Sequence, residues 1–432
     1  MVEKAKDKSI KVYEDNDRFF DVLWEHIDNA RDYICIVTYA MDHKNVAGIT
    51  LQKLRNAARR GVKVFLVIDD LCFYANKEQL RALEREGGFA IRHNPTGKLW
   101  KQLTSGHALR FFCRNHQKVM LVDGALFCGS LNLANSYTSV RYGDGSFRDI
   151  NIILQRGSHP GGKRVRDFFR NMVLANEYFY PDKIKPEEIN KVFDELDSKY
   201  AWQEAEEAYP EGWPPKPFKG QGDTEVQRHV ESLLDREVSI FLEESPPKKT
   251  EVSTAVLEMI KRAEKSIKII QPYVTNVDEL EDLLIEAARD RGVQVEIVTA
   301  RIRDQPVYRT FLNADLFRRM HRECPNLKLW EEPYKFLHMK GIVIDDGKYL
   351  TLGSLNQDTW SFYCNNEANV LLVNEKAHEH PETLAYRSFM KVFNNLKREC
   401  RPVDFSERYT PMGKLENMWW RFFLSCSYIF AS

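Results

Sequence analysis

The chain has 432 residues, which is more than the roughly 100–200 residues of one ordinary domain, so we expect two or three domains. A hydrophobic fraction of 43% and a charged fraction of 29% are typical of globular proteins and exclude a disordered or collagen-like chain. Basic and acidic residues both number 63, and this balance argues against a general nucleic-acid-binding protein. The eight cysteines form no Cys-x-x-Cys pair, which argues against a zinc site and a disulfide framework.

The sequence contains an internal repeat, and this repeat determines the predicted architecture. Each copy reads as an amphipathic helix, a strand, a second helix and a second strand. The second helix ends at a glycine in both copies, Gly61 and Gly292, as helices commonly do. The strands are continuous apolar runs such as 64–68, which is typical of strands covered on both faces. We therefore predict two tandem α/β units.

A pair of strands joined by a short turn follows in each half. The first pair is expected at 118–123 and 125–129, and the second at 340–345 and 349–353. The spacing between copies is not constant, because the first half has a longer excursion between about residues 69 and 114. That excursion predicts a helix near 77–86 and a loop at Asn94-Pro95.

The segment 202–224 is rich in proline, glycine and acidic residues, as linkers and surface crossings are. The second half is expected to begin with a strand at 238–242. The predicted organisation is a first domain at 1–200, a linker at 201–236, a second domain at 237–410 and an aromatic C-terminal segment at 411–432.

The same set of chemistry-bearing residues occurs once in each half. The first is His116-x-Lys118-x(4)-Asp123 followed by Gly129-Ser130-Leu131-Asn132, and the second is His338-x-Lys340-x(4)-Asp345 followed by Gly353-Ser354-Leu355-Asn356. One match to His-x-Lys-x(4)-Asp is weak evidence, because roughly one such chain in twenty would contain it by chance. Two matches at the same place in a repeat are specific.

The chemistry of these residue types suits a phosphate better than a metal. A histidine and a lysine two positions apart on a strand point to the same face, and a fixed ammonium group would repel a metal ion. Lysine donates hydrogen bonds to anionic oxygens, and the histidine can attack phosphorus or transfer a proton. Two such half-sites would place two imidazoles and two ammonium groups around one phosphate and stabilise a pentacoordinate phosphorane. The predicted phosphate-binding residues are Lys118, Lys340, Ser130, Asn132, Ser354 and Asn356.

Each histidine also requires a carboxylate on its other ring nitrogen to fix its orientation. Asp149 stands 33 residues after His116, and Glu367 stands 29 residues after His338. We assign this orienting role to both carboxylates.

The duplicated motif resembles that of the phospholipase D superfamily, and the chain is similar over nearly its whole length to compact bacterial-type cardiolipin synthases without N-terminal transmembrane helices. Further similarities are Phe147-Arg148-Asp149, where the family usually has Trp-Arg-Asp, then Gln271-Pro272-Tyr273, Trp330-Glu331 and Trp419-Trp420. The resemblance implies two tandem α-β-α sandwich domains, packed as a pseudo-twofold dimer with one active site at their interface.

The resemblance also implies a two-step phosphatidyl transfer without a metal or other cofactor, with phosphatidylglycerol as the donor. It places the nucleophile at His116 and the acid/base at His338, although the symmetry of the sequence does not itself decide between them. Asp123 and Asp345 complete the motif's candidate catalytic residues, and we expect them to hold the strand turn rather than act on substrate.

Three other functions remain open from the sequence. A phospholipase D hydrolase would use the same intermediate with water as the acceptor, and a nucleic-acid phosphodiesterase would use the same chemistry. Zero net charge counts against the nuclease, and the intact motifs count against a non-enzymatic membrane scaffold. The expected partners are phospholipids and a membrane surface, with no nucleic acid and no obligate protein partner.

The expected location is peripheral, on the cytoplasmic membrane or on a mitochondrial membrane in a eukaryote. The charged residues 1–11 do not form a secretory signal, so secretion is not expected. The aromatic run 418–431, interrupted by Arg421, fits a final helix docked on the core or an interfacial membrane anchor.

Overall fold

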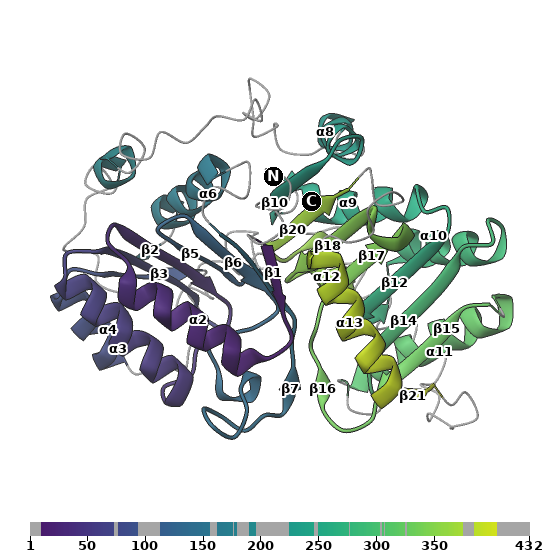
Figure 1. Ribbon diagram of the computed structural model, residues 1–432, viewed down its shortest axis with the longest axis horizontal. Coiled ribbons are helices and arrows are strands. Elements are labelled where there is room, and N and C mark those ends of the chain that lie inside the picture. The colour runs from purple at the N-terminus through teal and green to yellow at the C-terminus, as the bar shows by residue number, and fades with distance from the viewer. Residues whose placement is uncertain are drawn as a thin grey trace, which may run out of the picture.

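Two large mixed sheets dominate the computed structural model (Figure 1). The structure describes residues 10–72, 77–93, 113–155, 162–175, 177–178, 190–195, 224–245, 249–275, 277–302, 305, 307–324, 326–374 and 384–403. The Asn94-Pro95 loop, most of the proline-rich segment 202–224 and the aromatic run 418–431 lie outside these described residues. Within the described part of the chain, no helix combines the length and the apolar character that a membrane span requires.

The first half forms an eight-stranded sheet of order β1-β8-β6-β5-β2-β3-β4-β9. Its strands are β1 (Ile10–Tyr13), β2 (Tyr33–Thr38), β3 (Lys63–Asp69), β4 (Phe89–His93), β5 (Val119–Val122), β6 (Ala125–Gly129), β8 (Asn151–Leu154) and β9 (Glu177–Tyr178). Its helices are α2 (Asn16–Asn29), α3 (Asn45–Arg59), α4 (Lys77–Arg85) and α6 (Gly162–Ala175), with a 3-10 turn η3 (Asn135–Tyr137).

The second half forms a nine-stranded sheet of order β11-β10-β20-β18-β17-β12-β14-β15-β21. Its strands are β10 (Val238–Ser245), β11 (Lys249–Thr250), β12 (Ser266–Gln271), β14 (Gln294–Ala300), β15 (Lys328–Glu332), β17 (Gly341–Ile344), β18 (Tyr349–Gly353), β20 (Glu367–Val373) and β21 (Arg401–Pro402). Its helices are α8 (Thr224–Leu234), α9 (Glu251–Lys261), α10 (Asp278–Arg289), α11 (Val307–Glu323), α12 (Thr359–Tyr363) and α13 (Leu384–Glu399).

The two halves repeat one topology, which confirms the prediction of two tandem α/β units. Strand β2 pairs in parallel with β3 and antiparallel with β5, and β12 pairs in the same way with β14 and β17. The antiparallel pairs β5–β6 and β17–β18 are the predicted strand pairs. Gly61 and Gly292 follow the helices α3 and α10 with φ angles of +90° and +70°, a conformation that residues with a Cβ rarely adopt.

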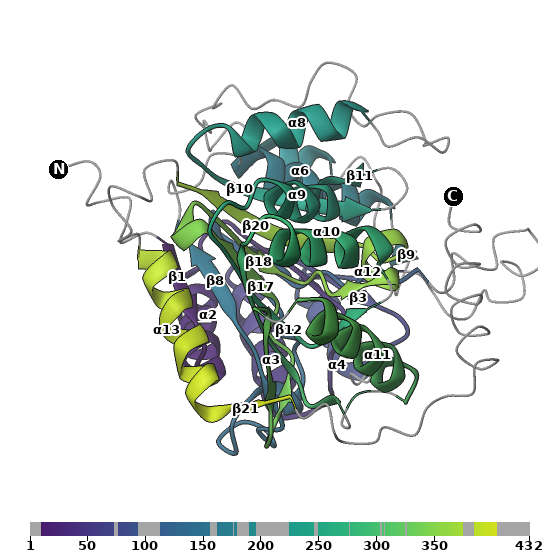
Figure 2. The same cartoon turned by 90° about the vertical axis from the view of Figure 1, so that its right-hand side faces the viewer.

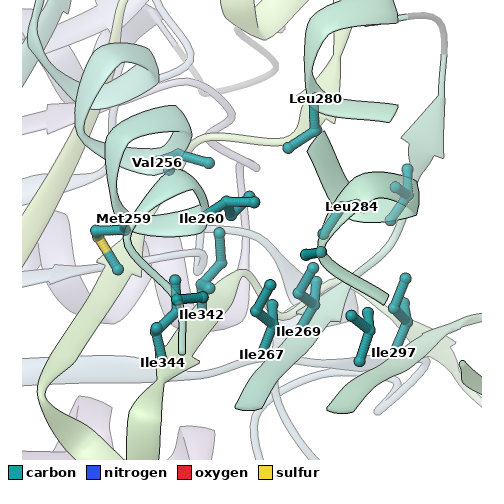
Figure 3. Packing of buried hydrophobic residues seen from close by; sticks show 14 of the residues in the cluster. Val256, Met259, Ile260, Ile267, Ile269, Leu280, Leu284, Ile297, Ile342 and Ile344 are labelled. Atoms are coloured by element: carbon teal, nitrogen blue, oxygen red, sulfur yellow. The ribbon is translucent and has the colours of Figure 1, made fainter. Parts of the chain in front are cut away.

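The strands are apolar on both faces because each sheet is covered on both sides. In β2, Ile34 and Ile36 belong to the core beneath α2, α3 and α4, whereas Cys35 and Val37 belong to a core shared with the second half. In the second half, Ile267 and Ile269 of β12 face the helices α9 and α10 (Figure 3). This two-sided burial explains the uninterrupted apolar runs of the sequence.

The shared core fixes the two halves against each other. Leu121 and Leu126 of the first sheet lie in one buried cluster with Val343 and Leu350 of the second. Helix α13 of the second half packs against strand β1 of the first (Figure 2). The interface between the halves is therefore built as a protein core.

The residues predicted as a linker are partly helical. Helix α8 occupies 224–234, inside the segment 201–236, and buries Val226, Val230 and Leu233 in the core of the second half. The amphipathic spacing of these residues favours a helix over an extended crossing.

Candidate active site

The two halves exchange short backbone segments at their interface. The segment before the first motif runs parallel to the segment before β20, with a bridge between Asn115 and Asn366. The His116 N–H donates to the Asn366 carbonyl at 2.9 Å, and the Asn366 N–H donates to the Arg114 carbonyl at 2.9 Å. A histidine-bearing segment of the first half is thus held by the second half.

The same arrangement occurs a second time with the halves reversed. Strand β16 (Phe336–Leu337) of the second half pairs in parallel with β7 (Phe147–Arg148) of the first, at the lower edge of Figure 1. The His338 N–H donates to the Arg148 carbonyl at 2.8 Å. In both cases the residue before the histidine pairs with the residue before a carboxylate, so the two junctions are related by pseudo-twofold symmetry.

Each histidine therefore contacts the carboxylate of the other half. The Nδ1 atom of His116 lies 2.9 Å and 3.0 Å from the two carboxylate oxygens of Glu367. The Nδ1 atom of His338 lies 2.8 Å from Oδ1 of Asp149. Spacing along the sequence associates each carboxylate with the histidine of its own half. In the structure, each carboxylate instead contacts the histidine of the other half.

Hydrogen bonding to a carboxylate places the proton of a neutral imidazole on Nδ1 and leaves the Nε2 lone pair available for reaction. Burial lowers the pKa of both histidines. For His338, which is 8% exposed, burial and the Lys340 ammonium outweigh Asp149 and lower the pKa to about 3. For His116, burial outweighs the opposing charge of Glu367. Neutral imidazoles are the forms suited to nucleophilic attack and to general-base chemistry.

The two motif lysines belong to the same site. The Nζ atom of Lys118 donates to the His116 carbonyl at 2.5 Å, and that of Lys340 donates to the His338 carbonyl at 2.6 Å. Each lysine lowers the pKa of the histidine in the other half as well as that of its own. Burial in turn lowers the pKa of Lys118 to about 8 and that of Lys340 well below its usual value. An anionic group bound beside these two lysines would offset the free-energy cost of burying their positive charges.

The motif aspartates lie at the opposite ends of strands β5 and β17 from the histidines. The carboxylate of Asp123 accepts the backbone N–H groups of residues 31–33 at 2.7–3.1 Å. The carboxylate of Asp345 accepts those of residues 264–266 at 2.7–3.0 Å. Both aspartates have positive φ angles, 45° and 49°. Their oxygens fix the turns that enter strands β2 and β12, as we expect for residues that hold the strand turn, and a part in catalysis stays a prediction.

The serines of the two Gly-Ser-x-Asn turns are engaged within the protein. The Ser354 hydroxyl donates to Glu367 and accepts the Ala368 N–H at 2.9 Å. The Ser130 hydroxyl donates instead to the Ile150 carbonyl at 3.1 Å. Each serine therefore secures the segment that carries an orienting carboxylate, and contact of either hydroxyl with phosphate stays a prediction.

The two asparagines of these turns differ in their contacts. Asn132 accepts the Ala40 N–H at 3.1 Å and donates to the Tyr137 hydroxyl at 2.7 Å. Asn356 is 7% exposed, and its Oδ1 atom has no hydrogen-bond partner among the described residues. Phosphate binding by either asparagine also stays a prediction.

Three residues of this site were missed by the sequence reasoning. The Asp69 carboxylate accepts the Arg114 guanidinium at 3.0 Å and the Asn115 N–H at 2.9 Å, and so anchors the segment that leads to His116. Ser361 donates to Glu367 at 2.6 Å. The Tyr39 ring packs edge-on against the His116 ring at 5.1 Å between centroids. Only Asp69 carried a signal, an acidic residue at the end of a buried strand, which is common in turns.

The fold and the site define a class of proteins built from two related α/β halves with a His-Lys pair from each. The chain belongs to the family described as "Cardiolipin synthase, PLD-like domain", whose profile matches residues 23–155 and 256–387. The resemblance to this family is thereby confirmed.

Individual proteins are similar at modest identity. A cardiolipin synthase of Staphylococcus aureus (strain Mu50) is 26% identical over 376 residues, covering 86% of this chain and 65% of that protein. A probable cardiolipin synthase of Bacillus subtilis, YwiE, is 24% identical over 374 residues, covering 85% of this chain and 63% of that protein. The chain thus spans about 65% of the first relative's length.

A solved structure supports the fold. The phosphatidylserine synthase of Haemophilus influenzae superposes with a TM-score of 0.64 at 14% identity, covering 97% of this chain and 93% of that one.

Within the described residues, no group of three or more His, Cys, Asp or Glu side chains has an arrangement that could hold a metal ion.

Proposed function

We propose that the protein is a phosphatidyltransferase that makes cardiolipin from phosphatidylglycerol. The observation that carries this proposal is the crossed arrangement of His116 with Glu367 and His338 with Asp149, beside two buried lysines. Two imidazoles with fixed Nδ1 atoms supply a nucleophile and an acid/base, and two ammonium groups supply charge for a phosphorane. The similarity to cardiolipin synthases supports the substrate assignment.

In the first step, Nε2 of His116 attacks the phosphorus of phosphatidylglycerol and forms a phosphohistidine. The bond from phosphorus to the glycerol oxygen breaks, and protonated His338 donates its proton to that oxygen. The negative phosphodiester favours this protonated form, because it offsets the lysine charges that help to lower the pKa of His338.

In the second step, neutral His338 accepts the proton of a headgroup hydroxyl from a second phosphatidylglycerol. That oxygen attacks phosphorus, and His116 leaves as a neutral imidazole. The products are cardiolipin and glycerol, and no redox change or cofactor is involved.

The decisive experiment incubates the purified protein with phosphatidylglycerol vesicles and identifies the products by mass spectrometry. Cardiolipin and glycerol are expected, and His116→Ala and His338→Ala are each expected to abolish both products. Phosphatidic acid with glycerol would favour the phospholipase D alternative. If phosphatidylglycerol is not turned over at all, the proposal is contradicted, and nucleic-acid diesters become the substrates to test.

We further propose peripheral association with a phospholipid surface, since both substrates reside there. The aromatic run 418–431 is the segment that the sequence offers for this contact, and it lies outside the described residues. Truncation after residue 417 is expected to weaken cosedimentation with phosphatidylglycerol vesicles, whereas unchanged binding would assign the segment a structural role.

A further inference from the structure

The pseudo-twofold symmetry of the site allows its two histidines to be compared position by position. Leu337 pairs with Arg148 at one junction, and Asn115 pairs with Asn366 at the other. The preceding pair at the first junction is Phe336 with Phe147. By the same register, the equivalent pair at the second junction is Arg114 with Asn365.

Aromatic side chains surround His338. The Phe147 ring stacks on the imidazole, with centroids 5.6 Å apart and an interplanar angle of 27°. Tyr137 packs edge-on against the same imidazole at 5.2 Å, and Phe336 lies 5.0 Å from Phe147. Phe147 and Phe336 are partly exposed, so neither ring is sealed inside a closed core.

The positions equivalent to Phe336 and Phe147 at the other junction are the polar residues Arg114 and Asn365, while the Tyr39 ring packs edge-on against His116. The Arg114 guanidinium pairs with Asp69, and the Arg114 N–H donates to the Asn365 side-chain oxygen at 3.0 Å. Glu367 accepts hydrogen bonds from Ser354 and Ser361 in addition to His116. Asp149, beside His338, has a buried Oδ2 atom with no partner among the described residues.

The difference matters because the two histidines meet different reactants. Under the proposed function, on which this inference rests, His338 activates the acceptor for attack on the phosphohistidine. A water molecule is held at a protein surface by two to four polar partners, and the phenyl rings of Phe147 and Phe336 supply none. A lipid hydroxyl is delivered by the rest of its own molecule and does not depend on such partners.

We propose that Phe147 and Phe336 are specificity-determining residues that favour phosphatidyl transfer over hydrolysis, by denying water a bound position beside His338. Phe147 and Phe336 thus control whether water or a lipid hydroxyl attacks the phosphohistidine, and they do not control how the phosphohistidine forms. Arg114 and Asn365, at the equivalent positions beside His116, have no such effect, because His116 carries the phosphatidyl group.

The test replaces Phe147 with the residue of the equivalent position, as Phe147→Asn, and measures the ratio of phosphatidic acid to cardiolipin. Both products arise from one phosphohistidine, so their ratio does not depend on the fraction of folded enzyme. We expect Phe147→Asn to raise the ratio about tenfold over wild type. Phe147→Trp and Phe147→Leu are matched controls, because they keep an apolar surface, and we expect ratios within about twofold of wild type.

Phe336→Asn is measured in parallel, and we expect it to raise the ratio of phosphatidic acid to cardiolipin by a similar factor. This variant still tests the inference if Phe147→Asn does not fold. A ratio unchanged in either soluble asparagine variant, while both products still form, would overturn the inference and leave the proposed function intact. A raised ratio in Phe147→Leu equal to that in Phe147→Asn would also overturn it, because side-chain volume rather than polarity would then be responsible. Absence of both products in the wild type would instead contradict the proposed function.

Discussion

Glu367 lies within 2.9 Å of Nδ1 of His116, although 251 residues separate them in the chain. The same relationship, with the halves exchanged, joins Asp149 to His338 across 189 residues. Neither half therefore holds a histidine together with the carboxylate that orients it. The arrangement proposed for catalysis exists only when the two halves are packed against each other.

The first prediction concerns this crossed pair. Glu367→Gln preserves the shape of the side chain and removes its charge, so under the proposed function we expect kcat for cardiolipin formation to fall by about 10²–10⁴ with little change in KM. Asp149→Asn is the matched variant at the equivalent position beside His338, and we expect it to lower kcat by a similar factor. An unchanged kcat in Glu367→Gln would show that this carboxylate does not orient His116.

The second prediction separates the motif aspartates from the chemistry. Asp123→Ala removes the acceptor of three backbone N–H groups, so we expect the free energy of unfolding to fall by about 2–3 kcal/mol. The turnover of each folded molecule should stay within a few-fold of wild type, since the carboxylate lies at the far end of β5. Urea unfolding and kcat per folded protein measure the two effects, with Asp345→Ala as the matched variant. A hundredfold loss of kcat at unchanged stability would return Asp123 to the catalytic group.

The third prediction concerns the pH dependence of stability. The native pKa of His338 is lowered to about 3, below the unfolded value of about 6.5. As pH falls below 6.5, the unfolded state takes up a proton that the native state does not, so folding is progressively disfavoured. The wild type should lose stability relative to His338→Gln by up to about 1.4 kcal/mol per pH unit between pH 6.5 and 4.5.

Above pH 7, the stability difference between the wild type and His338→Gln should be flat, because His338 is neutral in both states. Denaturant unfolding of both proteins at matched pH values measures this difference. A constant difference from pH 7 to pH 4.5 would show that native His338 titrates normally.

The fourth prediction concerns metal ions. The ammonium groups of Lys118 and Lys340 lie beside the histidines and would repel a divalent cation, so we expect turnover in excess EDTA to equal that without it. Rates measured on vesicles and on a water-soluble phosphodiester separate the chemistry from effects on the lipid surface. Loss of activity on the soluble substrate, restored by added metal, would contradict the proposed mechanism.

Much of the fold was predictable from local sequence. The repeat of helix, apolar strand, glycine-terminated helix and apolar strand predicted both α/β units, and the predicted strand pairs correspond to β5–β6 and β17–β18. These features were accessible because they depend on residues near one another in the chain. Helix α8 was missed, because its apolar spacing lies beside a proline-rich segment that suggested a crossing.

The sequence by itself determined which residue types make up the candidate site, because the types and spacing of the residues in a duplicated motif do not depend on packing. It placed one His-Lys pair in each half and identified Asp149 and Glu367 as the carboxylates beside them. Only the tertiary structure decided which carboxylate serves which histidine, since that pairing is made by parallel backbone bridges between segments about two hundred residues apart. The unequal surroundings of the two imidazoles arise in the same way, because they come from side chains that only the packing of one half on the other brings together.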